Sequence, residues 1–85
     1  MDKTRLANLA SDLIIKQIYS DSEVDVTTKN FHDGQFGIIV VHFDDRYDSH
    51  NKSLTIYEWH SDAHIMRTFE YMKDVIAGER LIENE

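Results

Sequence analysis

The sequence predicts a single small α+β domain in the order α-β-β-β-α, a three-stranded antiparallel meander with the helices packed on the sheet. Apolar residues recur at helical spacing near both ends of the chain, over residues 3–19 and 62–77. Between them, residues 23–59 follow the period of two that is typical of strands, interrupted by polar runs. Short polar connections favour antiparallel neighbours, so we expect a meander.

The first helix is predicted by one apolar stripe. Residues spaced i, i+3, i+4 and i+7 share a face of a helix, so we expect them to be buried together. The polar run at residues 20–22 ends this pattern. The expected stripe consists of Leu6, Leu9, Ala10, Leu13 and Gln17, widened by Ile14 and Ile18.

Three strands are expected after this helix. Residues 23–31 alternate between two faces, one of them charged, which predicts an edge strand where charge discourages aggregation. Asp33-Gly34 then gives a strong hairpin signal. Residues 35–43 are apolar on both faces, as in a central strand. After a polar loop at 44–52, residues 53–59 form the third strand.

A second helix is predicted from Ser61 or Asp62, which suit its cap, to about Ala77, with Gly78 just after its end. Its expected stripe consists of Ile65, Met66, Phe69, Met72 and Ile76. We therefore assign residues 1–78 to one domain. We expect the acidic segment 79–85 to fray, although Leu81 and Ile82 are able to dock back on the domain.

The composition limits the classes of function. A chain of 85 residues without cysteine has no disulfide, thiolate zinc site or cysteine nucleophile, which is compatible with a reducing compartment. Charges are mixed through the first helix, which predicts a cytoplasmic protein with no secretory signal and no membrane span. Nine Lys and Arg stand against sixteen Asp and Glu, a net charge of −7. This surplus repels nucleic acid and attracts a basic protein surface.

The two helices have two ways of covering the sheet. With one helix on each face the domain is closed, and Tyr57 and Trp59 are ordinary semi-buried residues. With both helices on one face, Tyr57 and Trp59 stay open and are available to a partner or to a second copy that forms a homodimer through the open sheet face.

Five carboxylates are expected to gather at one end of the sheet. The start of the first strand lies near the end of the second in an antiparallel meander. We expect an acidic pole for a basic partner there, or simply a solvated end that keeps the protein in solution. A calcium site is disfavoured because the glycine and the ligand spacing of an EF-hand are missing. The five residues are Asp21, Glu23, Asp44, Asp45 and Asp48.

Three histidines, His32, His60 and His64, are expected near the opposite end of the sheet. Three imidazoles are a ligand set that suits zinc with an open water position, so they are candidate metal ligands. Asp62 beside them is equally well explained by the dipole of the second helix. No oxyanion hole or phosphate-binding loop accompanies a nucleophile in this sequence.

The expected function is that of a small, acidic, non-enzymatic protein–protein interaction module without a cofactor. In size, charge and layout the chain looks like many phage- or mobile-element-encoded inhibitors, which block nucleases, CRISPR effectors, restriction enzymes or toxins. That resemblance implies a basic, nucleic-acid-handling partner. One alternative is a metal-binding protein or metal-dependent hydrolase that uses the three histidines. Another is an acidic protein that contacts nucleic acid only together with a protein partner.

Overall fold

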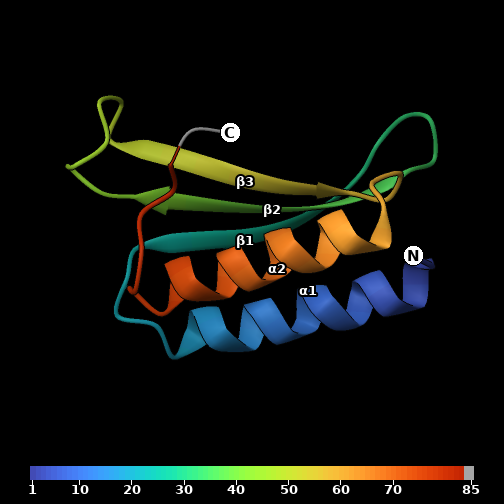
Figure 1. Cartoon of the computed structure of the whole chain (residues 1–85), viewed down its shortest axis with the longest axis horizontal. Helices are drawn as coiled ribbons and strands as arrows, with labels where there is room; N and C mark the ends of the chain where they lie inside the picture. The colour runs from blue at the N-terminus through green and yellow to red at the C-terminus, as the bar shows by residue number, and fades with distance from the viewer. Residues whose placement is uncertain (84–85) are drawn as a thin grey trace.

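The computed structural model describes residues 1–83 and confirms the α-β-β-β-α order. Helix α1 spans Lys3–Ile18 and helix α2 spans Asp62–Ile76. Strands β1 (Val24–Asn30), β2 (Phe36–Phe43) and β3 (Asn51–Tyr57) form an antiparallel sheet in the order β1-β2-β3. The predicted edge strand is therefore an edge, and the strand that is apolar on both faces is central. Both helices lie side by side on the same face of the sheet (Figure 1).

The helix ends follow from local chemistry. The side chain of Asp2 accepts a hydrogen bond from the Arg5 amide at 2.8 Å, which caps α1. Ser61, one of the two predicted caps, accepts from the His64 amide at 3.1 Å and begins α2. After α2, Gly78 adopts a φ of 79°, a left-handed conformation that favours glycine and ends the helix.

The core lies between the helices and one face of the sheet. In β2 the buried side chains are those at alternate positions, and β3 adds two more from the same face. The helices contribute side chains at three- and four-residue spacing. The largest fully buried residues are Leu6, Leu13, Ile38, Val40, Ile56, Ile65, Met72 and Val75.

Three stripe residues predicted to be buried are exposed. Ile14 and Ile18 of α1 expose 39% and 71% of their surface, and Met66 of α2 exposes 38%. The reason is geometric: two helices that share one face of a narrow sheet each bury only a narrow stripe. Residues at the margin of the predicted stripe therefore face water.

Strand β3 lies two residues earlier than predicted. Its ladder with β2 begins at the pair Phe43–Asn51 and ends at the pair Gly37–Tyr57. The His60 amide donates to the Tyr57 carbonyl at 3.0 Å, so the chain turns where the sequence pattern alone suggests more strand.

A buried hydrogen-bond network holds the segment after α2. The Tyr47 hydroxyl lies 2.8 Å from His42 Nδ1 and accepts a hydrogen bond from the Ile82 amide at 2.7 Å. His42, Tyr47 and Ile82 are all buried. Tyr71 also accepts from the Glu83 amide. Of the segment 79–85 expected to fray, residues 81–83 thus lie against the domain, and 84–85 fall outside the described residues.

The difference between buried and exposed side chains of α1 can be tested by measuring stability. We expect Leu13→Ala, which leaves a cavity in the core, to lower the free energy of unfolding by roughly 2–5 kcal/mol. Ile18→Ala, five residues further along the helix, should change the value for the dilute, single chain by no more than about 0.5 kcal/mol, because that side chain is exposed there. Urea denaturation of the two variants measures both values. Equal losses would contradict the placement of the buried stripe.

Burial lowers the pKa of His42, because the charged imidazolium loses contact with water. This effect outweighs the negative charge of Asp44, which acts to raise the same pKa. The unfolded chain therefore takes up a proton first as pH falls below about 6.5, and the free energy of unfolding decreases from there down to the folded-state pKa of His42. We expect a smaller loss of stability between about pH 7.5 and 5.5 in His42→Gln than in the wild type. Urea midpoints at the two pH values test this, and an unchanged difference would count against it.

Candidate functional site

The candidate site is the face of the sheet that the helices leave uncovered, here called the open face. Its middle row comes from β2, where the half-buried residues Ile39, Val41 and Phe43 alternate with the buried residues of the face that the helices cover. Thr27 and Thr55 flank Ile39 in the ladders of β1 and β3. Of the two arrangements considered for the helices, the structure shows the one that leaves an open apolar face.

One end of the open face is aromatic. The Phe31 and Tyr57 rings lie 5.5 Å apart, and Tyr57 stacks on Trp59, also at 5.5 Å and with only 14° between the planes. Lys29 Nζ lies 5.0 Å from the centre of the Phe31 ring. Tyr57 is half-buried, whereas Trp59 exposes 68% of its surface. We call Phe31, Tyr57 and Trp59 the aromatic end.

Gly37 makes room for this arrangement. A Cβ atom on Gly37 would lie 2.6 Å from Cε2 of Phe31, so any larger residue displaces the ring. Gly37 is also paired with Tyr57 in the β2–β3 ladder. The Phe31 ring therefore lies over the backbone of β2 and beside Tyr57, where it covers an otherwise bare stretch of strand.

His60 and His64 extend the aromatic end toward α2. The His60 ring lies 4.4 Å from the Trp59 ring and 4.2 Å from the His64 ring. The Tyr57 amide donates to His60 Nδ1 at 3.2 Å, which leaves the proton of the neutral ring on Nε2. Burial, followed by the charge of His64, lowers the pKa of His60.

The predicted three-histidine ligand set is not brought together. His60 and His64 are neighbours, whereas His32 is an exposed residue of the β1–β2 turn. Within residues 1–83, no three His, Asp or Glu side chains are grouped so that they could hold a metal ion. The geometry supports a role for His60 in holding the turn after β3.

The opposite end of the open face is acidic. The Glu23 carbonyl accepts from the Phe43 amide at 2.9 Å, which extends the β1–β2 ladder by one residue. Glu23, Asp44 and Asp45 then surround a shallow hollow together with Phe43 and His50. We call Glu23, Asp44 and Asp45 the acidic end.

The charges of the acidic end are unequal. Arg46 binds Asp44 through two hydrogen bonds, at 2.8 and 2.7 Å, and holds the pKa of Asp44 far below its usual range. Asp44 is therefore ionised but largely neutralised. Asp45 is fully exposed and lies 3.3 Å from His50, so Asp45 and Glu23 carry most of the available negative charge.

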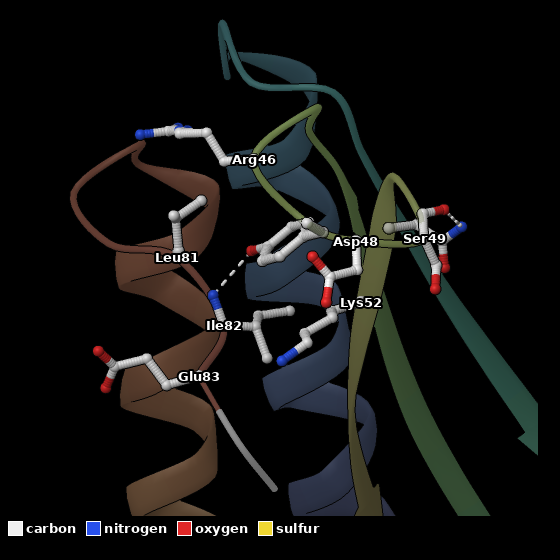
Figure 2. A pocket seen from close by; sticks show the side chains of 9 residues that line it. Arg46, Asp48, Ser49, Lys52, Leu81, Ile82 and Glu83 are labelled. Carbon is white, nitrogen blue, oxygen red and sulfur yellow. Dashed lines mark hydrogen bonds between the residues drawn. The ribbon is translucent and has the colours of Figure 1, made fainter.

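The other two predicted members of the acidic pole lie elsewhere. Asp48 lines a hollow with Arg46 and Lys52, beside the C-terminal segment that contains Leu81 and Ile82 (Figure 2). Asp21 lines a third hollow at the C-terminal ends of the two helices, where lysines are also present. The predicted pole is thus divided among three hollows, and two of them contain basic side chains.

Phe31 and Gly37 belong to the aromatic end but are absent from the site residues predicted from the sequence. Phe31 lies just before the turn of the β1–β2 hairpin, and Gly37 is the second residue of β2, so the two form a diagonal cross-strand pair. This cross-strand pairing is the sequence signal by which both residues could have been predicted to belong to the site. The acidic end and the aromatic end share one chemical property, since carboxylates and exposed indole faces both attract Lys and Arg side chains.

No protein-family model, curated protein or solved structure matches this chain. Neither helix in residues 1–83 combines the length and the apolar composition that crossing a membrane requires.

The single tryptophan reports on the aromatic end. A protonated imidazole quenches indole fluorescence, so we expect emission to fall as His60 takes up a proton 4.4 Å from the Trp59 ring. Because the pKa of His60 is lowered, the midpoint should lie below about pH 6.5. His64→Gln should raise the midpoint, since it removes the charge that opposes protonation. Fluorescence titration measures both, and quenching that persists in His60→Gln would show the geometry to be different.

Proposed function

We propose that this protein is a small acidic, non-enzymatic interaction module that binds a basic protein surface through its open face. The observation that carries the proposal is that one uncovered apolar row joins an aromatic end to an acidic end. The row supplies area that gains free energy when it is removed from water. The two ends supply attraction for Lys and Arg side chains at fixed positions.

The aromatic end is suited to anchor a partner. Exposed Trp and Tyr side chains are frequent hot spots, because they bury a large area at a low cost in side-chain entropy. Trp59 is held by Tyr57 on one side and by His60 near its edge, so its ring is already ordered before a partner binds. A guanidinium or ammonium group has room over the exposed part of the indole.

The charge selects the class of partner. A chain of net charge −7 is repelled by nucleic acid but attracted to proteins that bind nucleic acid, because those proteins carry basic surfaces. Blocking such a surface is one way to inhibit a nuclease, a CRISPR effector or a toxin. Phage- and mobile-element-type inhibition is therefore the biological role that we propose, within the cytoplasm.

Affinity capture from a cell extract tests the proposal. We expect the immobilised wild-type chain to retain a basic protein at about 50 mM salt and to lose most of it at about 500 mM, since surface charges are screened. Trp59→Ala and the double reversal Glu23→Lys with Asp45→Lys should each reduce capture at least about tenfold. Mass spectrometry identifies the retained protein, and its band intensity gives the change.

The controls carry matched changes on the helix side of the molecule. Met66→Ala removes another exposed apolar side chain, and Asp74→Lys with Glu79→Lys reverses the same number of charges near the end of α2. Both should leave capture unchanged. If the controls lower capture as much as the open-face variants do, general charge and not the open face is responsible, and the proposal fails.

A further inference from the structure

Helix α1 has a second face that is unusual for a helix on the surface of a domain. Opposite its buried stripe, every exposed position on one side of the helix is uncharged. In a chain that is 29% charged, a solvent-facing helix surface is expected to carry Lys, Glu, Asp or Arg. We call this surface the outer stripe, and it consists of Thr4, Ala7, Asn8, Ser11, Ile14, Ile15, Ile18 and Tyr19.

Helix α2 provides an internal comparison. Its exposed positions include Asp62, Arg67 and Glu70, the charged pattern that is typical of a surface helix. The two helices lie side by side on the same sheet face and meet the same solvent (Figure 1). Of the two helices, only α1 has an uncharged solvent-facing surface, so exposure to solvent alone does not explain it.

The outer stripe ends in a large apolar patch. Ile14, Ile15, Ile18 and Tyr19 expose 39%, 56%, 71% and 84% of their surfaces. Four of the six large hydrophobic residues that are exposed within residues 1–83 belong to this patch. Together they leave on the order of 500 Å² in contact with water, at the upper end of what monomeric proteins expose. Adding the rest of the stripe approaches the ~800 Å² per partner of a standard interface.

We propose that the outer stripe is the contact through which two copies of this chain form an antiparallel α1–α1 dimer. This inference goes beyond the proposed function and does not depend on it. Charge favours a second copy as the occupant. Residues 3–18 hold three basic side chains and one acidic side chain, so α1 is a part of this −7 chain in which acid is not in excess. Two copies therefore meet without juxtaposing their carboxylates.

The border of the stripe is self-complementary. Asp12 and Lys16 lie one turn apart, are both partly exposed and pair within the helix at 3.0 Å. With a two-fold axis near Ile14 and Ile15, the two helices are antiparallel. Asp12 of each copy then faces Lys16 of the other copy, so two ion pairs form across the axis. The same axis places bulky Ile18 toward the partner's small Ser11, as interdigitated helix packing requires. One axis therefore satisfies both charge and shape.

Such a dimer leaves the proposed partner surface free. The outer stripe faces away from the sheet, because α1 lies between them (Figure 1). The two open faces then point in opposite directions from the dimer axis. Each copy keeps its own aromatic end and acidic end accessible, whereas a homodimer through the open sheet face would cover both.

Sedimentation equilibrium of the full chain tests the dimer. We expect a concentration-dependent mass that approaches twice that of the 10.0 kDa chain. Ile15→Glu and Ile18→Glu should each raise the dimer dissociation constant at least about 30-fold. The melting temperature, measured on chains dilute enough to be monomeric, should stay within a few degrees, because both side chains are exposed in the single chain. Met66→Glu on α2 is the matched control and should leave the dimer intact. A chain that stays monomeric at about 1 mM overturns the inference.

Two further measurements identify the contact. Asp12→Lys should weaken the dimer, and adding Lys16→Asp should restore it, because the swapped pair is complementary again across the axis. Since the chain has no cysteine, Ile14→Cys should become covalently dimeric with a short thiol-specific cross-linker, whereas Met66→Cys should not. A dimer that survives Ile15→Glu but is dissociated by Val41→Lys on the open face would overturn the assignment to α1. Capture of a basic partner is measured separately, so it distinguishes failure of the dimer from failure of the proposed function.

Discussion

The packing of both helices on one face of a three-stranded sheet is the constraint on which the other features depend. Both helices bury side chains against the sheet face on which Ile38 lies. These fully buried side chains are Leu6 and Leu13 of α1 and Ile65 and Met72 of α2. A small domain obtains most of its stability from one such layer of apolar contacts. Once this layer is filled, no helix or strand within residues 1–83 remains to cover the other face, and the apolar row of β2 stays in contact with water.

A second, polar constraint joins regions that are distant in sequence. The Tyr47 hydroxyl contacts the end of β2 through His42 and the C-terminal segment through the Ile82 amide. Each group would be costly to bury alone, and together they satisfy one another. No side-chain N or O atom that is buried within residues 1–83 lacks a hydrogen-bond partner. The loop between β2 and β3 is thus held to the segment after α2 that contains Ile82.

The element order was predictable because periodicity in this sequence is strong, and the Asp33-Gly34 turn and the Ser61 cap are local signals. What required the structure were relations between elements. The exposure of Ile18 depends on the neighbouring helix, and the position of Phe31 depends on Gly37 across the hairpin. The acidic pole was only partly predictable, since a sequence gives the charge of Asp44 but not its bidentate contact with Arg46. The convergence of the histidines depended on a register that periodicity does not fix.

The one-sided sheet also divides the chain by its tolerance to change. Residues of the helix-facing layer contribute most of the stability of the fold, so most substitutions there lower the fraction of molecules that are folded. Positions on the uncovered side, such as Thr27, Thr55 and Asp45, contribute little to that layer. Their side chains are therefore free to vary with little loss of folded molecules. If the open face binds a partner as we propose, such an architecture lets successive single substitutions change that partner while each intermediate chain still folds.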